Sequence, residues 1–418
     1  MRGEDCVNRT KTTTSRILAG ILTMVMLLAL MPGFTLPTQA ASAGISNDSL
    51  SVTIGDLGQI EVLNIVNNPA NSSGNQVNFV LPNNTSPQNG VQHQWMGEMI
   101  FSTRSADTID GLTGDFVEVD TNKTLAEGGS TTYSNASSNL NSNPYINKTV
   151  VSDKKVEIDF IGQDSDSTAA RAMKGFDVKS TFDMDTDDGS MLWEITLTNK
   201  SAKYIEFGDV GLPVPWNNKY TSVNDTYLSR VTAHTFAGAD SGYAYAIRCS
   251  GEGNYMLFAP VPESGARIEY VDHWQGNNNG VAHYRTGSTY TNWTGDSGGW
   301  QPGLSVYYLH SKDIRTKTGS GYFTDSSSLV LAPGESETYQ FKFAAVRAGD
   351  NGPQDSAASP NNASDFVEER EATMRSILYN LGMIDAVAVP SVQTAINVPA
   401  KLDLHYNSSL VTDVNVQI

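Results

Sequence analysis

The chain has 418 residues, of which 39% are hydrophobic and 17% are charged, and its formal net charge is −18 at pH 7. A chain of this length can bury a sizeable core without disulfides. The excess of acidic residues argues against nucleic acid and anionic membranes as partners.

Residues 1–43 have the pattern of a secretory signal peptide. Four basic residues between Arg2 and Arg16 precede an apolar run, residues 17–30. This run of about 14 residues is shorter than the ~20 that a membrane-spanning helix needs. Cleavage after residue 43 removes four basic and two acidic residues and leaves the mature chain with a formal charge of −20. We expect a secreted protein with no membrane span in the mature chain.

The cysteine content also bears on the source. After cleavage only Cys249 remains, so the mature chain cannot form an intrachain disulfide. Cys249 has no CxxC motif and no basic cluster beside it in the sequence, so we expect a buried, unreactive thiol. Secretion without disulfides favours a bacterial, Gram-positive source and an extracellular location.

From residue 44 to residue 348 the sequence predicts a β domain. Short runs of alternating apolar residues are separated by Gly, Asn, Ser and Asp, which is typical of antiparallel sandwiches and barrels. We predict an all-β, two-sheet antiparallel supersandwich. The expected strands include Leu50–Ile54, Ile60–Ile65, Val77–Leu81, Lys155–Ile161, Phe176–Asp183, Tyr243–Ile247, Tyr255–Pro260, Ala266–Val271, Leu304–Leu309 and Tyr339–Val346.

The clearest strand begins at Met191. Trp193, Ile195 and Leu197 alternate with more polar residues, which predicts one buried face and one wet face. A turn follows, and then a second strand that leaves the sheet through two prolines into Trp216 and Asn217.

Residues 349–389 read as a linker and a helix. Asp365 is the expected N-cap, with Glu368 three residues later as in a capping box, and Gly382 stands where a C-terminal glycine belongs. After Pro390 the alternation resumes. We interpret residues 390–418 as the start of a further, truncated domain, with a strand docked on the sandwich as the alternative.

The segment from Asp272 to Trp300 is the best candidate for a binding site. An expected strand leads into Asp272, His273 and Trp274, and an Asn/Gly-rich loop follows. Trp293 and Trp300 lie within the next thirty residues, and Trp216 with Asn217 is expected to line the same groove. Aromatic faces stack on sugar rings, and amide, carboxylate and imidazole groups hydrogen-bond to hydroxyls. The alternative is that Trp274 packs in the core.

Two other motifs are weaker. A GDSGG string around Ser297 resembles serine proteases, with His234 and Asp272 as partners, but Ser297 follows His234 by only 63 residues. We interpret the string as a turn.

The carboxylates of residues 183–194 follow the spacing of an EF-hand calcium loop, yet position 6, where glycine is required, is Asp188. A β-hairpin fits better. We expect no cofactor, with calcium left open.

The order of several segments resembles a known family. LWEITLTNKS (192–201), FGDVGLPVPWN (207–217), the DHW loop (272–274), LAPGESETYQFKF (331–343) and the linker helix follow one another. This succession resembles the N-terminal galactose-mutarotase-like β-supersandwich of secreted bacterial enzymes with an (α/α) toroid, the six-hairpin glycosidases and polysaccharide lyases.

The resemblance implies an ancillary carbohydrate-binding module of a glycoside hydrolase or polysaccharide lyase. Its partners would be an oligo- or polysaccharide and a downstream catalytic domain that carries the acid and base residues. A free-standing carbohydrate-binding protein and a sugar epimerase or mutarotase are the alternatives. For the last, His234, His273 and Glu98 have the required residue types, but their surroundings do not match the mutarotase motifs.

Overall fold

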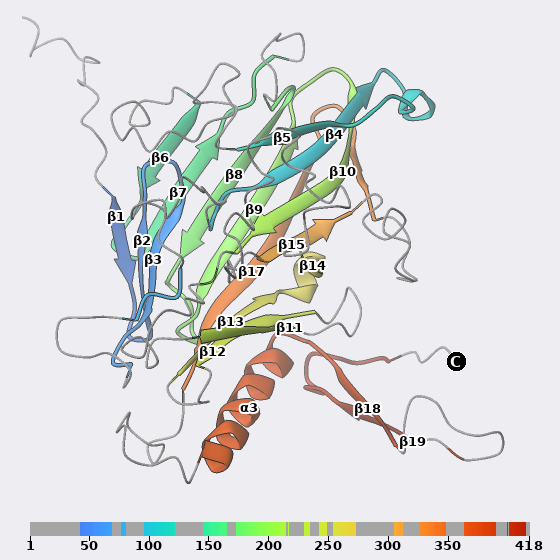
Figure 1. Ribbon diagram of the computed structural model, residues 1–418. Helices are drawn as coiled ribbons and strands as arrows, with labels where there is room; N and C mark the ends of the chain where they lie inside the picture. Colours follow the sequence, from blue (N-terminus) through green and yellow to red (C-terminus); the bar gives the residue numbers. More distant parts are fainter. Residues whose placement is uncertain are drawn as a thin grey trace, which may run out of the picture. The chain divides into compact units, whose positions relative to one another are not determined.

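A computed structural model shows the fold (Figure 1). The residues that it describes are 42–68, 77–80, 96–121, 145–164, 173–214, 216, 230–234, 242–248, 254–272, 305–311, 327–347, 363–389, 399 and 401–414. The predicted signal peptide lies outside them except for Ser42 and Ala43. Cys249 and most of the predicted linker also lie outside them.

The largest sheet has eight strands in the order β11-β12-β13-β17-β9-β8-β7-β6. All neighbours pair antiparallel. The strands are β11 (Arg230–His234), β12 (Ala244–Arg248), β13 (Tyr255–Pro260), β17 (Ser336–Val346), β9 (Met191–Asn199), β8 (Phe176–Asp183), β7 (Lys155–Phe160) and β6 (Ile146–Val150).

A six-stranded sheet has the order β14-β15-β10-β4-β5, and β16 also pairs with β10. Its strand pairs are antiparallel as well. The strands are β14 (Glu269–Asp272), β15 (Ser305–His310), β10 (Tyr204–Pro213), β4 (Ile100–Ala106), β5 (Val117–Asp120) and β16 (Leu329–Leu331). Short 3₁₀ turns, η2 (Ile109–Gly111) and η6 (Pro262–Ser264), follow β4 and β13.

The N-terminal strands form a small antiparallel sheet of their own: β1 (Ala43–Ser46), β2 (Leu50–Ile54) and β3 (Ile60–Ile65). β2, β3, β8 and β13 have the bounds that the sequence predicts. The described part of the chain is mostly β, with antiparallel sheets and one α-helix near its C-terminal end. The predicted fold class is therefore confirmed.

The alternation in β9 explains how the sheet packs. Trp193, Ile195 and Leu197 are fully buried, whereas the residues between them are partly exposed. The outer face is polar, and there Thr196 and Thr198 hydrogen-bond across to β17 at 2.9 Å. β9 thus has one face in the core and one toward solvent, as its period of two predicts.

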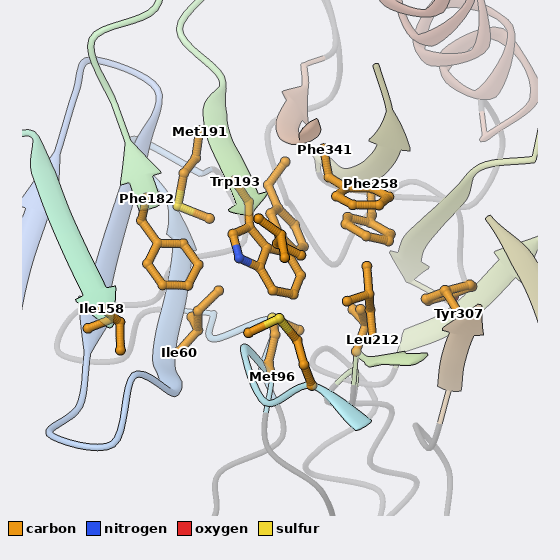
Figure 2. Packing of buried hydrophobic residues seen from close by; sticks show 14 of the residues in the cluster. Ile60, Met96, Ile158, Phe182, Met191, Trp193, Leu212, Phe258, Tyr307 and Phe341 are labelled. Carbon is orange, nitrogen blue, oxygen red and sulfur yellow. The ribbon is translucent and has the colours of Figure 1, made fainter. Parts of the chain in front are cut away.

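One apolar cluster, which we call the main cluster, joins residues of the eight-, six- and three-stranded sheets. Figure 2 shows the β9 side chain of Trp193 with Phe182 of β8 and, opposite them, Leu212 of β10 and Ile60 of β3. The Trp193 and Phe182 rings stack with centroids 5.7 Å apart. The Trp193 indole also donates to the Ser180 hydroxyl at 2.7 Å, which satisfies its one polar group.

One expected strand is absent. Residues Val77 to Phe79 are not assigned to a strand, although the Phe79 N–H donates to the Leu63 carbonyl at 2.9 Å, and Val80 makes an isolated bridge. The amide of Asn78 accepts from the backbone N–H of Leu63 and donates to the Glu61 carbonyl, both at 3.0 Å. The Asn78 side chain thus makes two of the hydrogen bonds to β3 that a ladder would make with backbone groups.

Helix α3 (Ala363–Asn380) packs on the outer face of the large sheet. Met374, Leu378 and Leu381 join Tyr255 and Leu257 of β13 in a second apolar cluster, which we call the helix cluster. The helix ends as predicted. Gly382 has φ +82°, and the N–H of Met383 donates to the Leu378 carbonyl at 3.1 Å, a Schellman-type end.

The predicted start of the helix is wrong. The helix begins at Ala363, so Asp365 lies within its first turn and is not the N-cap. Beyond the helix, β18 (Asp385–Val389) and β19 (Lys401–His405) form a separate antiparallel hairpin. The interpretation of residues 390–418 as a further domain stays a prediction.

Candidate functional site

Strand register brings several chain segments to one end of the six-stranded sheet. Asp272 pairs with Ser305, and Pro213 pairs with Val306 next to it. On the other side of β10, Gly211 pairs with Ile100, the first residue of β4. We call this the Asp272 end. Trp216 follows β10, and residues 96–99 precede β4, so both lie close in sequence to strand ends at the Asp272 end.

The segment 273–304 starts and finishes at the Asp272 end. Its two flanking residues, Asp272 and Ser305, are register partners, so both ends of the segment are fixed beside each other. The segment contains His273, Trp274, Trp293 and Trp300. These four residues, and the side chain of Asp272, lie outside the described residues, so their role in binding stays a prediction.

Trp216 is placed differently from a ligand-stacking residue. It is fully buried, its ring centroid lies 6.2 Å from that of Phe343, and its indole donates to the Tyr307 hydroxyl at 3.4 Å. Its backbone bridges to Val80. The Trp216 side chain thus packs in the main cluster beneath the Asp272 end, and Asn217 lies outside the described residues.

Glu98 lies just before β4, at the Asp272 end, and is fully buried. The sequence offered it by residue type alone as a mutarotase-like base. His234 is on β11, an edge strand of the other sheet, and its side chain lies outside the described residues. The structure therefore places Glu98 and leaves the proposed histidines untested.

A buried polar pair on the six-stranded sheet was not foreseen. The Ser102 hydroxyl donates to the Asp209 carboxylate at 2.8 Å and accepts from the Asp209 N–H at 2.9 Å. Both residues are only 1% exposed, and neither belongs to the main cluster. Ser102 and Asp209 are register partners, and the next pair along the strands, Phe101 and Val210, belongs to the main cluster. Because successive side chains point to opposite faces of a sheet, Ser102 and Asp209 lie on the face away from that cluster.

A bulge positions Asp209. The register of β10 against β4 shifts between Phe207 and Asp209, and against β15 it shifts between Val210 and Gly211. Bulges interrupt the simple alternation of faces and often re-aim a side chain near a site. The glycines at 208 and 211 are the only sequence signal for it, since an interior strand glycine often marks a bulge.

The same face carries an ion pair farther from the Asp272 end. The Arg104 guanidinium lies 2.6 Å from the Glu206 carboxylate, and both are partly buried. Arg104 also donates to the Gly114 carbonyl at 3.1 Å and lies over the Phe116 ring. These contacts hold the Arg104 guanidinium in place. Its positive charge and the negative charge of Glu206 therefore neutralise each other.

The one histidine whose ring environment the structure describes in detail is His310, at the far end of β15. Its Nδ1 faces the Ser327 carbonyl, and its Nε2 lies 2.8 Å from the Tyr339 hydroxyl. Burial, together with the charge of Arg267, lowers the pKa of His310 to about 4, against the opposing effect of the Ser327 carbonyl. Burial also raises the pKa of Tyr339. The ring is neutral at physiological pH and acts in packing.

The structure describes the calcium-like motif but not the protease-like one. β8 and β9 form the predicted hairpin, with Asp183 opposite Leu192. Three of its carboxylates pair with lysines, and the described residues hold no group of three or more metal-binding side chains. Ser297 of the protease-like string lies outside the described residues.

The chain belongs to a family of unknown function, DUF5695, whose profile matches residues 86–353. No protein with a curated description matches the chain. The described residues contain no helix that is long and apolar enough to cross a membrane.

Solved structures share a similar arrangement. A polysaccharide lyase has 13% identity and a TM-score of 0.43, over 84% of this chain and 36% of the lyase. A galactose mutarotase related enzyme from Lactobacillus acidophilus has 8% identity and a TM-score of 0.37, over 75% of this chain and 99% of that one. A GH36 α-galactosidase from Geobacillus stearothermophilus has 10% identity and a TM-score of 0.30, over 73% and 40%.

These likenesses agree in kind with the resemblance expected from the sequence, a galactose-mutarotase-like β-fold of carbohydrate-active enzymes. The chain also spans only about a third of the lyase's length.

Proposed function

We propose that the chain is a secreted carbohydrate-binding module whose glycan site lies at the Asp272 end. The observation that carries this proposal is the strand register, which fixes both ends of segment 273–304 at the point where β10 and β4 also meet the end of the sheet. Half of the six tryptophans of the chain belong to that one segment.

The chemistry of the segment supports sugar over other ligands. Indole rings offer apolar faces to the CH groups of a pyranose, and the neighbouring Asn, Asp and His side chains pair with hydroxyls. The acidic charge of the chain disfavours nucleic acid and other polyanions. An uncharged glycan fits both features.

The module would serve a glycoside hydrolase or polysaccharide lyase of a Gram-positive bacterium, outside the cell, and would bind glycan beside a catalytic domain. The signal-like residues 1–43 and the ancillary-module resemblance support this. The catalytic acid and base would then belong to that partner domain.

One observation favours a second function, a sugar epimerase or mutarotase. Glu98 is fully buried at the Asp272 end, and a buried carboxyl group suits proton transfer. An anomer-interconversion assay of the mature chain tests this. Conversion that Glu98→Gln abolishes, with the melting temperature unchanged, would favour the enzyme over the binding module.

The binding proposal is tested by a glycan array followed by titration of the best ligand. Trp274→Ala should weaken binding about five-fold, because one stacked ring contributes on the order of 1 kcal/mol. Trp274→Phe should retain part of the affinity. Tyr406→Ala, which removes an exposed aromatic ring outside this segment, is the control and should bind like the parent.

Two outcomes would reject the site. One is an array in which no glycan binds. The other is unchanged affinity in Trp274→Ala, which would move the site away from segment 273–304.

A further inference from the structure

A cavity of about 860 Å³ lies on the outer face of the eight-stranded sheet. Its floor includes Leu192 of β9 with Gln340 and Lys342 of β17. These residues alternate with Trp193 and Phe341, which belong to the main cluster. The cavity is thus on the side of this sheet that faces away from the six-stranded sheet and from the Asp272 end.

Four chain segments that are distant in sequence form its walls. They are the β8–β9 turn (Asp185–Asp188), residues 261–263, the end of α3 (Asn380–Gly382) and the C-terminal turn at Ser409 and Leu410. The C-terminal turn is tied to the helix, since the Asn407 amide donates to the Asn380 side chain at 3.1 Å. The volume falls within the ~300–1,000 Å³ of small-molecule sites.

The lining is mixed rather than simply acidic. The lining includes Gln340, Asn380 and Ser409, which carry amide and hydroxyl groups, and the aliphatic side chains of Val261 and Leu381. Sugars present the same mixture, with hydroxyls at the rim of each ring and CH groups on its faces. A hydroxyl-rich ligand therefore finds partners for both of its surfaces.

The charge of the lining is negative after its ion pairs are taken into account. The carboxylate of Asp188 lies 2.6 Å from Lys342, and that of Asp185 lies 3.3 Å from Lys154. Among the described residues, neither Asp187 nor Glu263 takes part in an ion pair. These two carboxylates leave the cavity with an unbalanced negative charge.

The ion pair between Asp188 and Lys342 persists in mild acid. Burial tends to raise the pKa of Asp188, but hydrogen bonds from Lys342 and Ser190 lower it to about 2. The Asp188–Lys342 pair therefore remains ionised. Lys342 is paired with Asp188 and not with Asp187 or Glu263.

We propose that this cavity is a second ligand site, which binds a short oligosaccharide of positively charged amino sugars. Ammonium groups would pair with Asp187 and Glu263, while Gln340, Asn380 and Ser409 would hydrogen-bond to ring hydroxyls. Anionic ligands are disfavoured by the same carboxylates. The proposal does not depend on the Asp272 end, because the two places share no residue and lie on different sheets.

The test is calorimetric titration of the full chain with a glucosamine tetramer, at a pH where its amines are protonated. The N-acetylglucosamine tetramer, equal in length but uncharged, is the comparison ligand. We expect the charged tetramer to bind and the acetylated one to bind at least ten-fold more weakly. Because the contacts are partly screened, added salt should weaken binding of the charged tetramer.

The variant Asp187→Asn/Glu263→Gln should weaken binding of the charged tetramer about five-fold, as expected for two exposed ion pairs. The control is Asp110→Asn/Asp115→Asn, which removes two exposed carboxylates outside the cavity and should change the affinity less than two-fold. Trp274→Ala should also leave this binding unchanged, which separates the cavity from the Asp272 end.

Equal affinity in the cavity variant and its control would overturn the site. Equal binding of the two tetramers would overturn the charge preference, and absence of binding by the charged tetramer would overturn the proposal as a whole. Loss of binding in Trp274→Ala would assign the ligand to the Asp272 end instead.

Discussion

Strands β9 and β13 belong to the same sheet, separated only by β17, yet they are buried differently. β9 alternates between buried and partly exposed residues, whereas all six residues of β13 are buried. The inner face of β13, with Phe258, joins the main cluster, and its outer face, with Tyr255 and Leu257, joins the helix cluster. What covers the second face decides the pattern, and α3 covers only β13 and its neighbours.

The two clusters therefore differ in how they are enclosed. The main cluster lies between sheets and contains stacked aromatic rings such as Trp193 and Phe182. The helix cluster is closed on its outer side by one helix. A region enclosed by a single element is expected to open locally at lower free energy than a core between sheets. Loss of packing should thus have larger global effects in the main cluster.

The strongest expected effect is that of Trp193→Ala. The side chain is fully buried among aromatic rings, and its removal also leaves the Ser180 hydroxyl without its indole donor. We expect a loss of about 3–5 kcal/mol in the free energy of unfolding, measured by urea denaturation.

Trp193→Phe should lose clearly less, because it keeps most of the ring. On the wet face of the same strand, Thr196→Ala should cost less than ~1 kcal/mol. Comparable losses for Trp193→Ala and Thr196→Ala would contradict the description of β9 as a strand with one core face.

Acid should weaken the main cluster through His310. The folded-state pKa of about 4 lies below the 6.5 of an unperturbed histidine, so the unfolded chain binds the proton more readily. This contribution to stability is complete above pH 6.5 and is lost as the pH falls toward 4. The loss reaches about 3 kcal/mol. Urea denaturation across this range measures it.

His310→Gln removes the titrating group and should flatten the part of the pH dependence that His310 causes. The variant should be less stable at neutral pH, where the Tyr339 and Ser327 contacts matter. A pH profile identical to that of the parent would show that other groups dominate acid unfolding.

Some of these elements could be predicted from the sequence, and others could not. The β9 strand and the glycine end of α3 were predictable, because alternation and a C′ glycine are local signals. The start of α3 at Ala363 was missed, since Asp365 and Glu368 imitate a capping box inside the helix. The strand predicted from Val77 is not formed over the described residues 77–79, where the Asn78 side chain makes two of the hydrogen bonds to β3.

The candidate site depends on non-local features that a single sequence does not display. That segment 273–304 begins and ends at one place follows from the pairing of Asp272 with Ser305, 33 positions apart. The burial of Trp216 depends on contacts with Phe343 and Tyr307, from two different sheets. Asp209 was missed because a bulge, which breaks the alternation, directs it away from the main cluster.

The smallest of these effects, and the sharpest test of the contrast, is expected from Leu378→Ala in the helix cluster. Leu378 is 3% exposed and packs on the outer face of β13, so its truncation should cost about 2 kcal/mol. Ser376→Ala, on the exposed side of the helix, is the control. In native-state hydrogen exchange, Leu378→Ala should lower the protection of α3 amides and leave that of β9 amides unchanged, because the helix opens as a local unit. An equal loss of protection in α3 and β9 would mean that both clusters unfold together, and the distinction between a core enclosed by sheets and one closed by a helix would have no thermodynamic counterpart.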